Sequence, residues 1–444
     1  MDRKSVQEFL EQNAIETVIV AGTDPSGVLR GKRLTVPYFL DIADKGITFA
    51  SFLMTTTTMD EVLPGVFDTG IPDVRGVPDL DSLRLAPWEP KTAAVLMDWV
   101  DASGAPSPLC PRSELKRQRE RLRAMGLAET FAMELEFFLF PTSIERIRKG
   151  GWADIEPGSV DKHCYSVYEG NFWESLVARI RSCFEREIEG CLPEWGPGQF
   201  EINLRQTDAL SMADTTVLFK TAVKQMAAQE GIAATFMAKW HGEHSGNSGH
   251  IHQSLRWAED GTPAFHDPGQ PDGVSELLRQ YVAGQLDVFR PATIFFAPFV
   301  NSYKRFEPDS FAGVMCNWGF NNRTVALRVM NDSPGSTRLE HRVGGADLNP
   351  YTAIAACMGA GARGIEQQLE LGPPAEGNAY HGDAPDQVPA SLSEAVEATA
   401  ASTGIRAVLN DEFVDNIVRI ARFEVGVHNA TVTDLDRRRY FEMA

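Results

Sequence analysis

The stretch FAMELEFFLF (131–140) places two charged side chains inside a strongly apolar run. In a β-strand alternate side chains point to the same face, so Glu134 and Glu136 should share one face of a sheet. Because four large apolar residues follow at once, both faces of this strand should be buried. An unpaired carboxylate is costly to bury, so the pattern predicts a strand that carries charge into a special site.

Three later segments repeat this pattern: GPGQFEINLR (196–205), SGHIHQSL (248–255) and STRLEHRV (336–343). The polar residues that should share a face within each segment are Gln199 with Glu201, His250 with His252, and Arg338 with Glu340 and Arg342. A single acidic pair on a half-buried strand is more often a solvated face. Four such strands could together line one hydrated cavity.

Converging carboxylates need cations, since two of them about 4 Å apart repel by about 4 kcal/mol at an effective dielectric near 20. The candidate metal ligands are Glu134, Glu136, Glu194, Glu201, His250 and Glu340. Hard oxygen ligands of this kind select Mg²⁺ or Mn²⁺ over zinc. Two ions held by six protein groups would leave positions for water and substrate, as phosphoryl transfer from ATP requires.

Five arginines lie close together later in the sequence: Arg305, Arg323, Arg328, Arg338 and Arg342. Isolated arginines are usually solvated, but the last three lie within strand-like segments and are the better candidates. Guanidinium groups clamp carboxylates and phosphates with paired hydrogen bonds. The glycine-rich piece HGEHSGNSGHIH (241–252) offers close backbone approach to a small ligand, although it matches no phosphate-loop pattern.

The composition excludes several classes of function. The chain has 444 residues, of which 42 are basic and 61 acidic, giving a formal charge of −19 that disfavours binding to nucleic acid or an anionic membrane. Six cysteines without a C-x-x-C pair indicate neither a zinc knuckle nor a disulfide framework. No signal-peptide core and no apolar run of roughly 18 residues is present. We therefore expect a cytoplasmic protein without nucleic-acid or membrane partners.

The chain should fold as an α+β protein with two domains. Residues 1–105 combine strand-like runs with one helix, and a turn-rich stretch then precedes the larger unit, 106–444. Apolar periodicity predicts three helices in that unit, at 113–126, 215–231 and 349–370. The segment 371–391, rich in Pro, Gly and Asp, should be a loop.

Six motifs in this order, MELEFF, EWGPGQFEI, GNSGHIHQSL, NSYKRF, NNRTVALRV and RLEHRVGGADLNPY, resemble those of class I glutamine synthetase and its glutamate–amine ligase relatives, the γ-glutamylpolyamine and γ-glutamylmonoamine synthetases. The resemblance runs from VIVAGTDPSGVLRGKRL to TVTDLDRRRYFE. It implies an N-terminal β-grasp domain and a C-terminal catalytic domain whose curved antiparallel sheet, flanked by helices, forms a funnel-shaped site. It also implies a homo-oligomer, a dodecamer of two hexameric rings, with each site at a subunit interface.

The resemblance also implies a role for each matched residue. The first metal would be held by Glu136, Glu194 and Glu201, and the second by Glu134, His250 and Glu340. Glutamate would be bound by Gly246, Arg305 and Arg342. The nucleotide and the transferred phosphoryl group would face His252, Ser254, Arg323, Arg328 and Arg338. The catalytic residues would be Arg323, Arg305 and Glu340, and the cofactors ATP with two or three Mg²⁺ or Mn²⁺ ions.

The implied reaction is an attack by the γ-carboxylate of L-glutamate on ATP, giving γ-glutamyl phosphate, from which an amine displaces phosphate. The flap PDSFAGV (308–314) departs from the ammonia-using pattern, because Phe311 stands where those members carry a glutamate. A phenyl ring cannot accept a proton but can pack on a carbon chain. We therefore expect an organic mono- or polyamine as acceptor, contacted by Phe311. Two alternatives are a true glutamine synthetase that uses ammonia and a catalytically silent structural or regulatory relative.

Overall fold

A computed structural model describes residues 1–381 and 386–443 and contains two β-sheets. The first sheet has the order β2-β1-β6-β4-β3, with β5 paired to β6, and only β1 and β6 run parallel. Its strands are β1 (Thr17–Thr23), β2 (Leu29–Thr35), β3 (Ile47–Ala50), β4 (Asp73–Pro78), β5 (Arg84–Leu85) and β6 (Thr92–Val100). Helices α1 (Arg3–Gln12) and α2 (Val36–Ile42) add Val6, Leu10 and Phe39 to its core.

The second sheet has the order β12-β13-β14-β11-β7-β9-β8, with β10 paired to β7. All its pairings are antiparallel except that of β12 with β13. Its strands are β7 (Leu127–Phe140), β8 (Ile188–Pro193), β9 (Gln199–Thr207), β10 (Ala233–Thr235), β11 (Gly249–Trp257), β12 (Trp318–Phe320), β13 (Leu327–Met330) and β14 (Arg338–His341). The four strands predicted to carry polar residues are thus adjacent.

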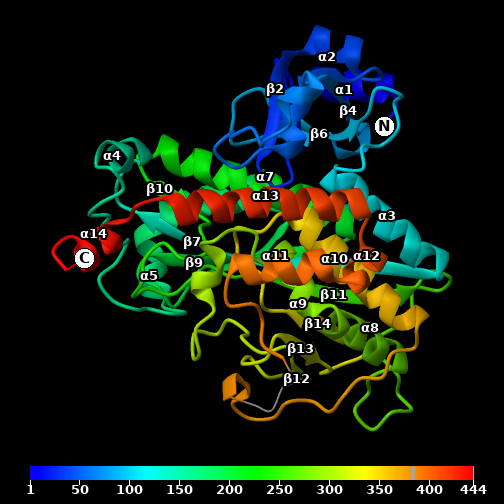
Figure 1. Cartoon of the computed structure of the whole chain (residues 1–444). Coiled ribbons are helices and arrows are strands. Elements are labelled where there is room, and N and C mark those ends of the chain that lie inside the picture. The colour runs from blue at the N-terminus through cyan, green and yellow to red at the C-terminus, as the bar shows by residue number, and fades with distance from the viewer. Residues whose placement is uncertain (382–385, 444) are drawn as a thin grey trace.

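Helices pack around this second sheet, as Figure 1 shows. They are α3 (Pro111–Ala124), α4 (Ile144–Lys149), α5 (Val167–Gly170), α6 (Glu174–Cys183), α7 (Ala209–Gln229), α8 (Glu276–Asp287), α9 (Phe289–Phe296), α10 (Pro350–Glu366), α11 (Leu392–Ala401), α12 (Thr403–Val408) and α13 (Asp411–Ala430). The last helix, α14 (Asp434–Tyr440), has no buried residue. Helix α10 is almost wholly buried. Its small residues let α8 approach closely, because a Cβ on Gly361 would lie 2.1 Å from the Tyr281 ring.

The three predicted helices correspond to α3, α7 and α10, and the α+β fold class is confirmed. Helix α7 begins six residues earlier than predicted, because the Asp208 side chain accepts hydrogen bonds from the backbone of Leu210 and Ser211. Within the described part of 371–391, regular structure is limited to a 3₁₀ turn, Ala379–His381. No described helix has the length and hydropathy needed to span a bilayer.

The strands of the first sheet all precede residue 105, and those of the second all follow it. The two units share apolar packing, however: Trp88 stacks on Phe184 at 5.4 Å between ring centres, within the large core of the second sheet. The division into domains at 105/106 stays a prediction, because chain order alone does not show that either unit folds independently.

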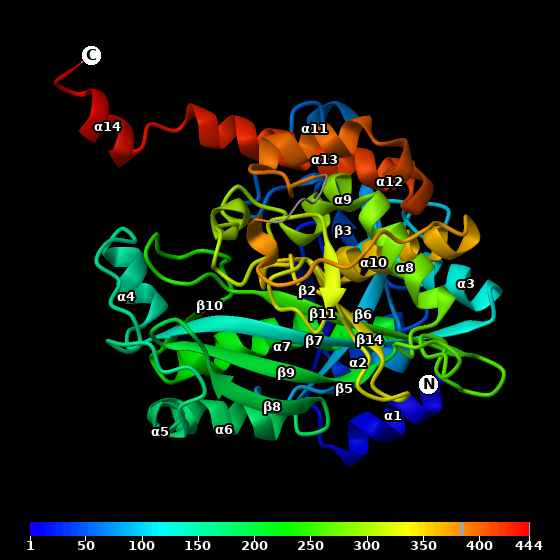
Figure 2. The ribbon, with the colours of Figure 1, turned by 90° about the horizontal axis from the view of Figure 1, so that it is seen from below.

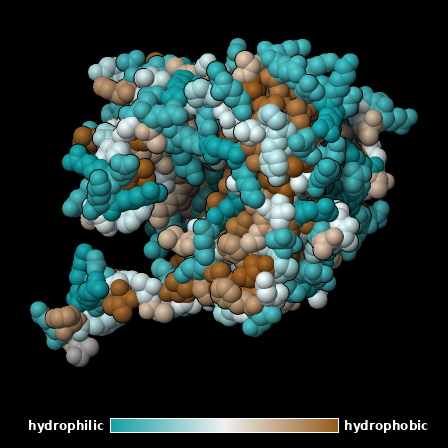
Figure 3. Space-filling model, turned by 90° about the horizontal axis from the view of Figure 1, so that it is seen from above, coloured by the Kyte–Doolittle hydropathy of each residue, from teal (hydrophilic) through white to brown (hydrophobic). Residues whose placement is uncertain are grey.

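The C-terminal segment leaves the body of the protein. Helix α13 lies across the surface, and α14 projects beyond it (Figure 2). Apolar residues are exposed along this arm, among them Val432, Leu435, Tyr440 and Phe441, and Figure 3 shows the arm as a separate lobe. A projecting apolar arm of this kind is typical of a segment that packs against another molecule.

Candidate active site

Strand pairing brings the predicted polar residues opposite one another. Glu134 on β7 pairs with His250 on β11, and Glu136 pairs with Glu201 on β9. On the other side of β11, His252 pairs with Glu340 on β14. The prediction that these residues share one face of a sheet is therefore confirmed by the register, and the face is continuous across four strands.

Three carboxylates converge at one end of this face. Oxygen atoms of Glu136, Glu194 and Glu201 all lie within 4.8 Å of one another. Glu194 follows β8 and is held by the backbone N–H of Trp195, which donates to Oε2 at 2.8 Å. The backbone N–H of Ser248 donates to Glu136 Oε2 at 2.6 Å. These backbone donors fix two of the three carboxylates in position without neutralising the group.

Burial and mutual repulsion destabilise the ionised form of these carboxylates. Burial, with the neighbouring carboxylates of Glu134, Glu136 and Glu194, raises the pKa of Glu201 to about 9. Burial and then Glu194 raise the pKa of Glu136 to about 7. A divalent cation would remove this penalty, because it favours the ionised carboxylates. The donor set, three oxygens in a polar cavity, fits Mg²⁺ or Mn²⁺.

The second predicted ligand group lies beside the first. His250 Nδ1 is 3.2 Å from Glu134 Oε2 and 3.6 Å from Glu340 Oε1. His250 Nε2 is buried and has no hydrogen-bond partner among the described residues, as expected of a nitrogen reserved for a ligand. His252, which was assigned to the nucleotide, also reaches this group, with Nε2 2.9 Å from Glu134 Oε1. The structure thus offers two histidines here, and the sequence prediction used only one.

Glu340 is engaged by two arginines. Arg342 Nη1 pairs with Oε1, and Arg328 Nη1 donates to Oε2 at 3.1 Å. Although burial alone would raise it, the Arg342 guanidinium lowers the pKa of Glu340 to about 2. Glu340 is therefore ionised, and each of its oxygens keeps a second lone pair for a metal ion while it accepts from an arginine.

The residues predicted to bind glutamate are adjacent. Gly246 has no room for a side chain, because a Cβ there would lie 2.1 Å from Arg305 Cγ. Arg305 is buried and donates to the carbonyl groups of Val343 at 3.1 Å and Gly344 at 3.0 Å. It therefore lies behind the wall formed by Gly246. Arg342 reaches the flap, with Nη2 donating to the Phe311 carbonyl at 3.4 Å.

A cavity of about 680 Å³ contains most of these groups. Its lining includes the predicted residues Glu134, Glu136, Glu194, Glu201, Gly246, His250, Phe311, Arg323 and Arg342. Six other predicted residues are not in its lining: His252, Ser254, Arg305, Arg328, Arg338 and Glu340. Except for Arg305, which lies in the 3₁₀ turn Ser302–Arg305, they continue along the sheet, where Ser254 Oγ donates to the Thr337 carbonyl at 3.0 Å and Arg338 Nε to His252 Nδ1 at 3.4 Å. The roles assigned to individual residues stay predictions.

The sequence interpretation missed several residues at the mouth of this cavity, notably Trp195, Lys162 and Tyr165. Trp195 directly follows Glu194 in the motif EWGPGQF, so its place beside a predicted metal ligand could have been noticed. Lys162 and Tyr165 lie in a loop without a sequence pattern, and no signal distinguishes them.

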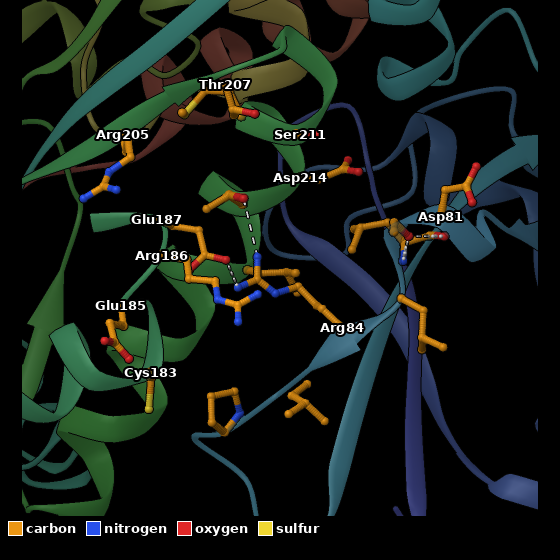
Figure 4. A pocket seen from close by; sticks show the side chains of 18 of the residues that line it. Asp81, Arg84, Cys183, Glu185, Arg186, Glu187, Arg205, Thr207, Ser211 and Asp214 are labelled. Atoms are coloured by element: carbon orange, nitrogen blue, oxygen red, sulfur yellow. Dashed lines mark hydrogen bonds and ion pairs between the residues drawn. The ribbon is translucent and has the colours of Figure 1, made fainter. Parts of the chain in front are cut away.

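A second pocket, of about 740 Å³, lies between the β5 segment on one side and the end of α6, the connection from α6 to β8, β9 and α7 on the other (Figure 4). Within it, Arg84 Nη2 is 2.6 Å from Glu187 Oε1, and Arg84 Nη1 is 3.5 Å from Thr215 Oγ1. None of the predicted site residues lines this pocket. The charge of Arg84 is thus satisfied inside the protein, and the converging carboxylates lie in the other cavity.

Comparison with known proteins places these features in a family context. A family model described as the catalytic domain of glutamine synthetase matches residues 108–440. A glutamate–isopropylamine ligase from a Pseudomonas species is 36% identical over 99% of this chain and 97% of its own. The γ-glutamylethanolamide synthetase GlnA4 of Streptomyces coelicolor is 39% identical, over 96% and 93%. The structure of ligand-free GmaS has a TM-score of 0.85 at 28% identity and covers 98% of each chain.

Proposed function

The chain belongs to the glutamine synthetase family and is an ATP-dependent ligase, and from this premise we propose that it joins L-glutamate to an organic mono- or polyamine. The γ-carboxylate would be activated as γ-glutamyl phosphate, and the products would be a γ-glutamyl amide, ADP and phosphate. The observation that carries the choice of acceptor is Phe311, whose ring lies at the mouth of the carboxylate-lined cavity.

Each part of the cavity has a task in this reaction. Glu136, Glu194 and Glu201 would hold one divalent ion, and Glu134 with His250 and Glu340 another, among two or three Mg²⁺ or Mn²⁺ ions in all. When bound, these ions supply positive charge to the ATP phosphates. Arg323 and Arg342, which line the same cavity, would neutralise the transferred phosphoryl group and the glutamate carboxylate. Gly246 has no side chain, so none lies between glutamate and Arg305 where glutamate would approach.

A true glutamine synthetase is the second candidate, and one observation favours it. Asp309, two residues before Phe311, lines the cavity, as does Glu243. Either carboxylate could accept the proton that Phe311 cannot. The nearby Glu307 is less suited, because its carboxylate lies 3.4 Å from Lys239 Nζ.

We also propose that the protein is a cytoplasmic homo-oligomer. The exposed apolar residues of the C-terminal arm support a homo-oligomer, for which we retain the dodecamer of two hexameric rings. All six cysteines are free, as is typical of a protein of the reducing cytoplasm.

Initial rates of ADP release test this function directly. The assembled protein is supplied with glutamate, ATP and Mg²⁺, and with ammonium, ethanolamine, putrescine or isopropylamine in turn. We expect an organic amine to give the highest kcat/KM, and F311E to shift the preference towards ammonium. Ammonium as the best acceptor of the wild-type protein would establish the second candidate. Absence of ADP release with every amine would indicate a silent relative.

A further inference from the structure

Two aromatic side chains of the cavity lining contact each other edge to face. The ring centres of Trp195 and Phe311 are 6.0 Å apart, with an angle of 64° between the ring planes. Both side chains are about half exposed, at 45% and 48%. They come from segments far apart in the chain, the β8–β9 connection and the flap. Exposed aromatic faces in an otherwise charged cavity are typical of a surface that receives an apolar ligand group.

The backbone of each aromatic residue makes a hydrogen bond to a residue of the proposed reaction centre. The N–H of Trp195 donates to Glu194 Oε2 at 2.8 Å, so its indole lies next to a proposed metal ligand. The carbonyl of Phe311 accepts from Arg342 at 3.4 Å, so its phenyl ring lies next to a proposed glutamate ligand. A group that packs on the exposed faces of the two rings would therefore lie near the point where the ions and glutamate would meet.

The backbone of the flap is held in a conformation that side chains other than glycine rarely adopt. Phe311 has a φ of 59° and Asp309 a φ of 61°. Such left-handed residues cost free energy and persist where the surroundings determine them. Gly313 allows this close packing, because a Cβ there would lie 2.7 Å from Ala326 Cα. The backbone of the flap thus sets the direction in which the Phe311 side chain leaves the main chain.

The charges around the two rings indicate how many positive charges the ligand can carry. Lys162 Nζ lies 5.0 Å from the centre of the Trp195 ring, in a cation–π contact. A second ammonium group that approached the Trp195 ring would be repelled by Lys162. The single ammonium of an incoming monoamine can instead be attracted by Glu243 and Asp309, which line the same cavity.

We propose that Trp195 and Phe311 form an acceptor clamp that binds the hydrocarbon chain of a primary alkyl monoamine. This inference rests on the proposed ligase function and narrows its substrate class from mono- or polyamines to monoamines. Burial of each methylene against the exposed faces of these rings should raise kcat/KM roughly fourfold. A second ammonium at the end of the chain should lower it.

The test compares methylamine, ethylamine, propylamine and isopropylamine with 1,3-diaminopropane, which is propylamine with a second amino group. For the wild-type protein we expect kcat/KM to rise roughly fourfold per methylene from methylamine to propylamine. We expect 1,3-diaminopropane to be at least roughly tenfold poorer than propylamine. Lys162→Gln should reduce the ratio of kcat/KM for propylamine to kcat/KM for 1,3-diaminopropane, since it removes the competing cation.

Variants of the clamp separate its contribution from that of the reaction centre. Trp195→Ala and Phe311→Ala should flatten the dependence on chain length while the KM for glutamate and for ATP stays within about twofold. Trp195→Phe should retain part of the dependence. Trp257→Ala is the matched control, because Trp257 is also an exposed tryptophan, at 44%, and lies outside the cavity lining.

The outcomes distinguish the clamp from the function on which it rests. If alkylamines are ligated but the dependence on chain length survives in both alanine variants, the clamp is wrong and the ligase function stands. The same holds if 1,3-diaminopropane is the best acceptor. If only ammonium is ligated, or no amine at all, the proposed function itself fails.

Discussion

Replacement of Glu201 by glutamine should stabilise the metal-free protein, because glutamine keeps the side-chain shape and does not have to take up a proton on folding. The pKa of Glu201 is raised from 4.5 to about 9 in the folded chain. At pH 7 the folded state therefore holds a proton that the unfolded chain has released. At about 1.4 kcal/mol per pKa unit over about 2.5 units, this costs folding about 3 kcal/mol, which the substitution removes.

Thermal unfolding in EDTA measures the effect. For a chain of this length, about 3 kcal/mol corresponds to a rise in Tm of about 3 °C. With saturating Mg²⁺ the order should reverse, because Glu201→Gln removes a ligand. Glu189→Gln, an exposed position on the neighbouring strand β8, is the control and should change neither value. A lower Tm of Glu201→Gln in EDTA, or an undiminished response to Mg²⁺, would refute the reasoning.

Three further predictions concern metal binding, glutamate binding and stability. Because the pKa of Glu201 is raised in the folded state, the stability of the metal-free protein should fall as the pH rises from 4.5 towards 9. Mg²⁺ should therefore raise Tm more at pH 8.5 than at pH 6. Equal increases in Tm at the two pH values would contradict this. Gly246→Ala should raise the KM for glutamate at least roughly tenfold in steady-state assays, because the new methyl would displace Arg305, while an unchanged KM would separate Arg305 from glutamate binding. Arg112→Met should destabilise the fold by about 3–5 kcal/mol in denaturant unfolding, because it leaves the carboxylate of Asp214, now 2.8 Å from Arg112 Nη2, buried without its partner; a loss below about 1 kcal/mol would contradict it.

The sheet face of the site could be predicted because alternation along a strand is a local property. The spacing of Glu134 and Glu136 in one segment, and of His250 and His252 in another, fixes their common direction wherever the strands pair. Their opposition across β7 and β11 depends on the register of the two strands, which the sequence did not predict.

Other parts of the site depend on the packing of loops and could not be predicted. Nothing in the sequence places Arg305 behind Gly246, since that contact joins a 3₁₀ turn to a glycine-rich loop. The approach of His252 to Glu134 follows from side-chain orientation across a strand pair. The pairing of Trp195 with Phe311 joins two connections separated by more than a hundred residues. Contacts of this kind are set by the whole fold.

The central claim, that the acceptor is an organic amine, is tested most directly by competition in a single reaction. The assembled protein receives glutamate, ATP, Mg²⁺ and equal concentrations of ammonium and isopropylamine, and mass spectrometry measures the ratio of γ-glutamyl-isopropylamide to glutamine. This ratio equals the ratio of the two kcat/KM values. We predict that the γ-glutamyl-isopropylamide exceeds glutamine at least roughly tenfold. Glutamine as the main product would contradict the account.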